Sequence, residues 1–271
     1  MEYTFPDYKK GLINVICSIE KYFKVPSKHN SLDLLDKILK ENNSKNVVLF
    51  LFDGLGYNIL KENKDICPFL YDNLITNISS NFPSTTMSAR TTVESGLTPK
   101  EHGHLGWDMY FKCFDEVICL SKNVIKGTNK SPCNYNVAKT LLKYEPVTDI
   151  INKKEGYISE TLRVYSNHKT ESLRKMKKKI KKLTKSKERA YVYAYYNEPD
   201  HALHNDGVGS DKMKKILAMA LALLFVAALF TGCSKKVESP SEPNANDVAS
   251  DTTEEVKERN KIMRDNSLDT A

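Results

Sequence analysis

The sequence predicts an α/β fold in which a mostly parallel sheet is flanked by helices. Two observations indicate it. Apolar runs typical of strands alternate with helical stretches, and two of those runs end near an Asp that could face a ligand. The chain has 271 residues, enough for a sizeable core, and 40% of them are hydrophobic. Ligands of such sheets bind outside the carboxyl ends of the strands, so the residues found there are the first candidates for a site.

The first 45 residues are predicted to be helical. Residues 11–23 place apolar side chains on one stripe of a helix. Residues 31–42 repeat such a stripe after Ser31, which is the predicted N-cap. Both helices are therefore expected to pack one face against the sheet.

Strands are predicted further along the chain. The six apolar residues 47–52 indicate a strand that is buried on both faces, and a helix is expected at 57–61. A second strand is predicted at 74–79. Two more are expected within 156–166 and 189–200, and the last of these runs again ends in an acidic residue.

The net charge of +7 comes from one segment. Residues 174–189 carry ten Lys or Arg against one Glu, with apolar residues at helical spacing, which predicts an amphipathic surface helix. A solvated face is the favoured interpretation, with a nucleic-acid or membrane patch as the alternative. The charge therefore gives no evidence of nucleic-acid recognition.

The six cysteines show neither a CxxC pair nor zinc-finger spacing, and the first eleven residues contain no apolar export segment. We therefore expect residues 1–210 to form one domain that is reduced and cytoplasmic.

The hydroxyl-rich residues 82–103 follow a predicted strand. A Ser or Thr at the first turn of a helix lies where backbone N–H groups favour an anion, which suits a nucleophile that attacks phosphate. A simple helix cap is the alternative. Asp53, directly after residues 47–52, is either a metal-binding carboxylate or a turn-forming residue before Gly54.

A carboxylate and an imidazole follow the last predicted strand. Asp200 and His204 are four residues apart, so they lie on one side of a helical turn and are compatible with a shared Zn²⁺ ion. His201 would point elsewhere. Two Asp residues at strand ends and a hydroxyl at a helix start are the layout that two-metal phosphoryl transfer requires.

Four motifs in order carry a resemblance to a known family: VVLFLFDGLG, FPSTT, SGLTPKEHG and NEPDHALH, within residues 45–207. The chain resembles the type I phosphodiesterase/nucleotide pyrophosphatase family of the alkaline phosphatase superfamily. The segment HLGW is similar to that of the cytoplasmic bacterial members. The resemblance implies the amino-terminal half of an alkaline-phosphatase-like sheet flanked by helices, and a hydrolase that acts on phosphorylated small molecules.

The resemblance also implies roles for particular residues. Thr86 corresponds to the nucleophile and shares one zinc ion with Asp53, while Asp200 and His204 bind a second zinc ion. His102 corresponds to a structural position. Trp107 stands where the nucleotide-cleaving members carry an Asn that contacts the phosphate.

The family completes both metal sites with later residues, an Asp-His pair and a further His. The last of the six histidines here is His204. We therefore expect an incomplete ligand set for the two zinc ions and an inactive or impaired enzyme. A phosphomutase of the same superfamily is one alternative, and a non-catalytic, membrane-attached fusion protein is another.

The character of the chain changes at Met213. Residues 213–233 combine a Met-Lys-Lys start, an apolar run over 216–230 and a Thr-Gly-Cys end, and so resemble a bacterial lipoprotein signal that would be lipidated at Cys233. A buried helix is the alternative. In the lipoprotein interpretation, residues 216–230 would contact the membrane. The polar residues 234–271 are expected to be disordered. Such a segment in mid-chain suggests that two coding sequences were joined.

Overall fold

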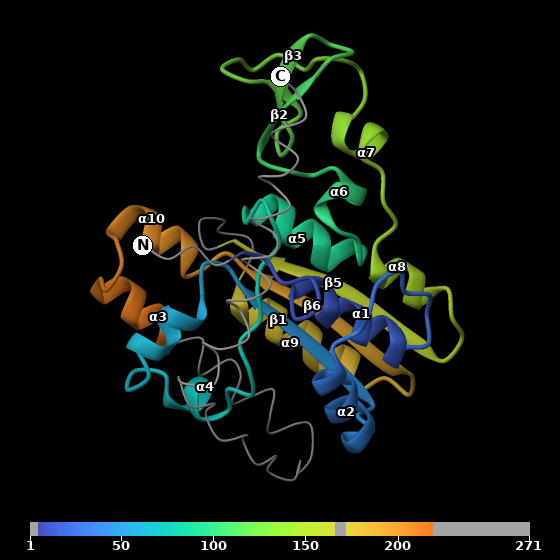
Figure 1. Cartoon of the computed structure of the whole chain (residues 1–271), viewed down its shortest axis with the longest axis vertical. Coiled ribbons are helices and arrows are strands. Elements are labelled where there is room, and N and C mark those ends of the chain that lie inside the picture. Colours follow the sequence, from blue (N-terminus) through green and yellow to red (C-terminus); the bar gives the residue numbers. More distant parts are fainter. Residues whose placement is uncertain (1–4, 166–171, 219–271) are drawn as a thin grey trace, which may run out of the picture. The chain divides into compact units, whose positions relative to one another are not determined.

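The computed structural model describes residues 5–165 and 172–218. Its central element is a parallel sheet with the strand order β1–β6–β5, formed by β1 (Asn46–Phe52), β5 (Tyr157–Val164) and β6 (Arg189–Tyr196) (Figure 1). Helices lie on both faces of this sheet. The predicted α/β class with a parallel sheet is therefore confirmed.

The helices occur between and around these strands. They are α1 (Leu12–Tyr22), α2 (Asp33–Asn42), α3 (Tyr57–Glu62), α4 (Pro68–Asp72), α5 (Thr86–Ser95), α6 (Pro99–His102), α7 (Val137–Leu141), α8 (Val147–Asn152), α9 (Leu173–Thr184) and α10 (Asp200–Asp206). A second, antiparallel sheet has the order β2–β3–β4 and consists of β2 (Asp108–Phe111), β3 (Glu116–Cys119) and β4 (Val124–Ile125).

The alternation of side chains along β6 divides the core into two layers. Tyr191, Tyr193 and Tyr195 point to one face, where they pack with apolar residues of α1, α5 and α8. The residues between them, among them Val192 and Ala194, point to the other face and pack with α9 and α10. Since successive side chains of a strand point to opposite faces, one strand supports both layers.

The strand β1 is less buried than its sequence predicts. All seven of its residues are only partly buried, whereas the last seven residues of β6 are buried. The reason is topological, because β1 pairs with β6 on one side and, among the described residues, with no strand on the other. The prediction of a strand here is confirmed. Its side chains pack against the core on both faces, with Leu49 in one layer and Phe50 in the other, but they are only partly buried.

Residues 74–79 do not form the predicted strand. Only Ser79 makes an isolated bridge, to Gly11, and the apolar Ile75 and Ile78 are exposed. None of its residues is fully buried, so little apolar burial would stabilise a strand here. The predicted cap at Ser31 is also wrong. Leu32 precedes α2, and the Ser31 hydroxyl donates to Asp36 instead.

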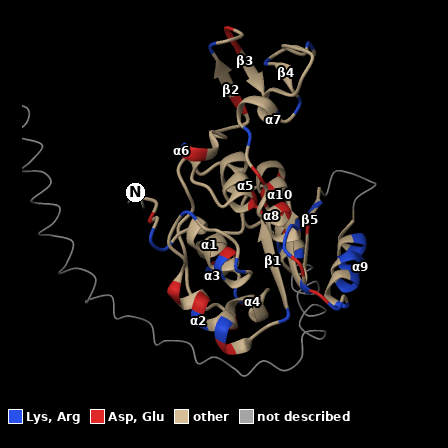
Figure 2. Cartoon of the chain, turned by 90° about the vertical axis from the view of Figure 1, so that its right-hand side faces the viewer, with Lys and Arg blue, Asp and Glu red and all other residues tan. Residues whose placement is uncertain are grey.

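The basic segment forms a helix, α9, as predicted, although it ends at Thr184 (Figure 2). Its Met176 and Ile180 are buried against the sheet. Leu173 and Leu183 pack beside them, and Lys and Arg occupy all other positions before Thr184. Lys179 pairs with Glu160 of β5 at 2.9 Å.

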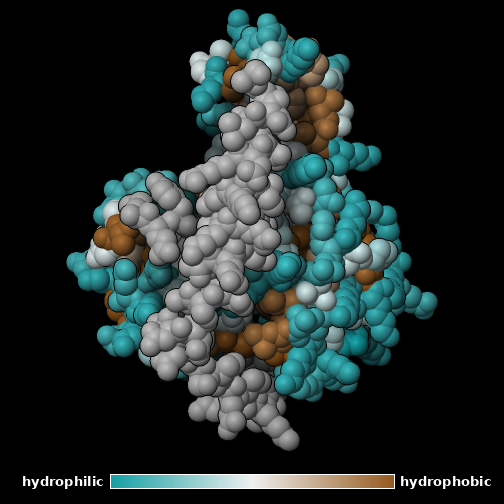
Figure 3. Space-filling view, in the orientation of Figure 1, coloured by the Kyte–Doolittle hydropathy of each residue, from teal (hydrophilic) through white to brown (hydrophobic). Residues whose placement is uncertain are grey.

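The small sheet β2–β3–β4 was not predicted from the sequence. Phe111, Ile118, Leu120 and Val137 form its core. Apolar side chains also reach its surface (Figure 3), among them Val117. Its strands have two to four residues, too short for a clear alternation of apolar and polar residues.

The beginning of the segment that resembles a lipoprotein signal is a buried helix in this structure. Residues 211–218 are helical, and Met213, Ile216 and Leu217 are buried. These features agree with the buried-helix alternative for residues 213–218, while 219–233 and 234–271 lie outside the described residues. Within the described part, no helix is long and apolar enough to cross a membrane.

Glu20 is a buried carboxyl group on α1. It lies against Gly96, the left-handed residue that ends α5 (φ 66°), where an added Cβ atom would come within 2.3 Å of Glu20 Oε1. Among the described residues, Oε2 has no hydrogen-bond partner. Burial raises the pKa of Glu20 to about 7, against the smaller, opposite effects of Ser27 and Cys17.

We predict that Glu20→Gln stabilises the protein above neutral pH. The raised pKa means that the folded chain keeps a proton that the unfolded chain loses between about pH 4.5 and pH 7, so wild-type stability falls as the pH rises through this window. Urea unfolding at about pH 8 should show a gain of up to about 3 kcal/mol in the variant, and near pH 4.5 almost none.

Glu41→Gln is the matched control, because Glu41 is exposed on α2 and should not change this pH dependence. A Glu20→Gln protein whose stability follows the same pH curve as the wild type would contradict the assignment.

Candidate active site

The predicted site residues gather at the carboxyl ends of β1 and β6. The backbone N–H of Asp53 donates to Tyr196 O at 3.0 Å, which extends the pairing of the two strands by one residue. The N–H of Asp200, the first residue of α10, then donates to Asp53 O at 2.9 Å. Two hydrogen bonds thus fix the backbones of Asp53 and Asp200 side by side.

Gly54 makes this approach possible. It has a left-handed conformation (φ 75°), and an added Cβ atom would lie 2.8 Å from Asp200 Cα. The turn that follows Asp53 therefore needs a residue without a side chain, for both conformational and steric reasons.

Thr86 is the first residue of α5, and its hydroxyl faces the Asp53 carboxylate. The Oγ1 atom lies 3.3 Å from Oδ2 and 3.4 Å from Oδ1. Its neighbour Thr85 is the N-cap of α5 and accepts a hydrogen bond from the Ser88 N–H at 3.3 Å. The hydroxyl cluster thus divides into a capping Thr85 and a Thr86 that is directed toward a carboxylate.

Tyr195 holds the same carboxylate from the sheet. Its hydroxyl donates to Asp53 Oδ2 at 2.7 Å. Burial raises the pKa of Asp53, and the nearby Asp200 adds to this effect, while Tyr195, Thr86 and Arg90 act in the opposite direction. Asp53 is therefore a more basic carboxylate than an exposed one, with two hydroxyl donors aimed at it.

Asp200 and His204 face each other across one turn of α10, with 3.5 Å between Asp200 Oδ2 and His204 Nε2. His204 is largely exposed, its side chain being 77% accessible. His201 Nδ1 lies 3.2 Å from the buried Glu198 instead. The structure thus brings Asp200 and His204 together, while His201 is directed to another partner.

The donor atoms lie as two pairs, Asp53 with Thr86 and Asp200 with His204. Catalytic zinc sites use three protein ligands. Residues 5–165 and 172–218 contain no group of three His, Cys, Asp or Glu side chains that could hold one metal ion. The residues present therefore suit zinc in their chemistry but do not fit a complete zinc centre.

A pocket of about 810 Å³ opens beside these groups. Its polar lining includes Asp53, Thr86, Arg90 and Asp200, and apolar side chains of α1, α2 and α3 line much of the rest. The pocket therefore joins a site with hydroxyl, carboxylate and guanidinium groups to a wider apolar surface.

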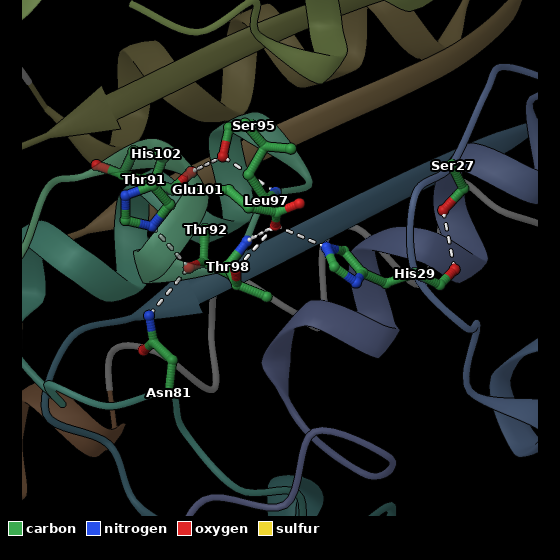
Figure 4. Close-up of polar contacts among 10 residues, drawn as sticks. All are labelled: Ser27, His29, Asn81, Thr91, Thr92, Ser95, Leu97, Thr98, Glu101 and His102. Carbon is green, nitrogen blue, oxygen red and sulfur yellow. Dashed lines mark hydrogen bonds and ion pairs between the residues drawn. The ribbon is translucent and has the colours of Figure 1, made fainter. Parts of the chain in front are cut away.

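A buried polar network fixes α5 to its surroundings (Figure 4). Asn81 Nδ2 donates to Thr92 Oγ1 at 2.9 Å, and Thr92 Oγ1 lies 3.0 Å from His102 Nε2. Asn81 Nδ2 also donates to Ser88 Oγ at 3.1 Å. His102 Nδ1 accepts from the His104 N–H at 3.0 Å, so its proton is on Nε2 and is donated to Thr92.

His102 remains neutral in this network. Burial, together with the neighbouring His104, lowers its pKa to about 4. A neutral ring can satisfy both of its nitrogens with the two partners present, which a charged ring could not. His102 thus connects the end of α6 to the middle of α5, the helix that begins with Thr86.

Sequence reasoning missed Asn81, Arg90 and Tyr195. Two of them had a signal in the sequence pattern. Arg90 follows Thr86 by four residues on one helix, and Tyr195 shares a strand face with Tyr191 and Tyr193 because every second residue of β6 points to the same side. Trp107, which the motif comparison singled out, is exposed in the loop before β2 and does not line the pocket.

Comparisons with known proteins agree with the motif pattern. The sequence model of the family described as "Type I phosphodiesterase / nucleotide pyrophosphatase" matches residues 47–220. No curated protein matches the sequence. Two structures of murine ectonucleotide pyrophosphatase/phosphodiesterase 5, one an inactive variant in complex with AMP, are similar with a TM-score of 0.49 and 18% identity. The similarity covers 68% of this chain, which spans only about half of theirs, 52% and 51%.

We predict that Thr92→Val destabilises the fold by about 1–3 kcal/mol, because it leaves the buried donors of Asn81 and His102 short of an acceptor. Thr91→Val is the matched control. Thr91 is equally buried on α5, but its hydroxyl bonds only to Met87 O of its own helix, so the cost should be below about 1 kcal/mol. Urea unfolding measures both, and equal costs would contradict the role given to the network.

Proposed function

Because the chain belongs to the type I phosphodiesterase/nucleotide pyrophosphatase family, we propose that its site hydrolyses a phosphoester of a small molecule and that Thr86 is the nucleophile. One observation carries the proposal: the Thr86 hydroxyl, at the first turn of α5, faces the Asp53 carboxylate within a pocket that Asp200 also lines. Helix starts favour bound phosphate, so the attacking oxygen and a phosphoryl group would meet there.

The proposed step is a displacement at phosphorus. The bond from Thr86 Oγ1 to phosphorus forms and the bond from phosphorus to the leaving oxygen breaks. The Thr86 proton passes to the Asp53 carboxylate that accepts its hydrogen bond and from there to the departing oxygen, so that an alcohol or phenol leaves. Water then attacks the phosphothreonine, one of its protons passes through Asp53 to Thr86 Oγ1, and phosphate leaves with the hydroxyl restored. Tyr195 holds Asp53 Oδ2 throughout, so the carboxylate keeps its orientation.

The family generally depends on divalent metal ions. We infer that Asp53 and Thr86 would contribute to one zinc site and that Asp200 and His204 would contribute to the other. Each pair is at least one ligand short of a catalytic zinc site. We therefore propose that turnover by this chain is weak or absent and that the shortage of imidazole ligands limits it.

The experiment is hydrolysis of bis-p-nitrophenyl phosphate by the purified chain with zinc, with and without added imidazole. We predict little turnover with zinc alone and a rise when free imidazole supplies a missing ligand. Thr86→Ser, which keeps a hydroxyl, should retain this rate within about tenfold, whereas Thr86→Ala should lose it.

His201→Ala is the control for an effect of zinc bound outside the site. His201 faces Glu198, so its removal should not change the rate of hydrolysis. Tight binding of two zinc equivalents with Thr86-dependent turnover, in the absence of imidazole, would show that the chain is not impaired. A rate that Thr86→Ala leaves unchanged would show that Thr86 is not the nucleophile. Release of phosphate from aryl esters, without formation of an isomerised sugar phosphate, separates a hydrolase from a phosphomutase.

A further inference from the structure

Arg90 lies one helical turn after Thr86 on α5. Positions four apart are neighbours on the same helix face, and both residues line the pocket together with Asp53 and Asp200. Among the described residues that line this pocket, Arg90 is the only one with a positive charge. An anion that enters beside Thr86 therefore meets a single cationic side chain.

Two aromatic rings position the guanidinium group. Its central carbon lies 4.4 Å from the ring centroid of Tyr195 and 5.8 Å from that of Tyr165. A guanidinium group that stacks on a ring keeps its N–H donors in its own plane, at its edges. Since Tyr195 also donates to Asp53, the same tyrosine positions both the carboxylate and the guanidinium group.

The donors of Arg90 are incompletely used. Its ion pair with Glu94 is long, 3.4 Å from Nη2 to Oε1. Glu94 is already bound by Arg163 at 2.9 Å and by the Tyr144 hydroxyl at 2.9 Å. The Nε atom of Arg90 is buried, and the described residues offer it no hydrogen-bond partner. Glu94 and the surrounding tyrosines raise the pKa of Arg90 despite burial, so the group stays charged.

We propose that Arg90 binds a non-bridging oxygen of the phosphoryl group that occupies the site next to Thr86. This inference rests on the proposed function and adds to it the group that recognises the substrate anion. The planar fork of a guanidinium group matches the oxygens of phosphate, and such charge-assisted hydrogen bonds are about twice as strong as neutral ones. Arg90 would also offset the repulsion of that anion by Asp53 and Asp200.

The test measures the binding of inorganic phosphate to the purified chain at about pH 6 without added metal. Broadening of the 31P NMR line of phosphate reports the binding. Phosphate should bind the wild-type chain, and Arg90→Met should weaken binding at least about tenfold. Arg90→Lys, which keeps the charge without the planar fork, should fall between the two. Circular dichroism shows whether Arg90→Met folds. If Arg90→Met does not fold, the phosphate affinity of Arg90→Lys still tests the inference.

Arg163→Met is the matched control. Arg163 pairs with the same Glu94 but is more exposed and does not line the pocket, so phosphate binding should not change. Absence of phosphate binding to the wild type overturns the inference. Phosphate affinity equal to that of the wild type in both Arg90 variants also overturns the inference. An equal loss of phosphate affinity in Arg163→Met and Arg90→Met does so as well.

Thr86→Ala separates the inference from the proposed function. It should keep phosphate binding and lose the turnover that zinc together with imidazole supports in the wild type. Normal turnover in Thr86→Ala, with phosphate binding that still depends on Arg90, would refute the nucleophile and leave the anion site intact. Turnover that depends on Thr86, with phosphate binding that does not depend on Arg90, would support Thr86 as the nucleophile and refute Arg90 as the phosphate-binding group.

Discussion

The site depends on the parallel pairing of β1 with β6. This pairing aligns Phe52 with Tyr196, so the residues that follow the two strands leave the sheet at the same edge. Two backbone hydrogen bonds then link Asp53 to Tyr196 and Asp200 to Asp53. A shift of one residue in this register would turn every side chain of one strand to the opposite face and would separate the two carboxylates.

The second constraint is the placement of α5, because Thr86 reaches Asp53 only if the helix starts at the right point. Thr85 caps the helix, and Gly96 ends it in a left-handed conformation against Glu20. Between these ends, Asn81 and His102 hold its middle through Thr92. Hydrogen bonds require defined distances and directions, so this buried network sets the position of the helix more narrowly than apolar packing would.

The sequence predicted what depends on local pattern. The strands β1, β5 and β6, the helices α1 and α9 and the residues beyond the strand ends follow from periodicity and from where apolar runs stop. The partial burial of β1 could not be predicted in this way, because the degree of burial depends on whether a neighbouring strand lies on each side of β1. The hydrogen bonds of Asn81 and Tyr195 could not be predicted either, even though the pattern places Tyr195 on a core face of β6, because their partners are 11 and 142 residues away in the chain.

The charges around Asp53 show what an additional cation would contribute to the site. Asp200 raises the pKa of Asp53, as burial does, whereas Arg90 lowers it. Two carboxylates and one guanidinium group leave the polar end of the pocket negative, and Glu94 competes for that guanidinium group. A phosphoryl group would add further negative charge. Arg90 can bind such an anion without metal, but its one positive charge leaves the combined charge of the anion and the two carboxylates negative. Divalent cations at the two donor pairs would reverse the sign of the site, so anion binding and metal binding should favour each other.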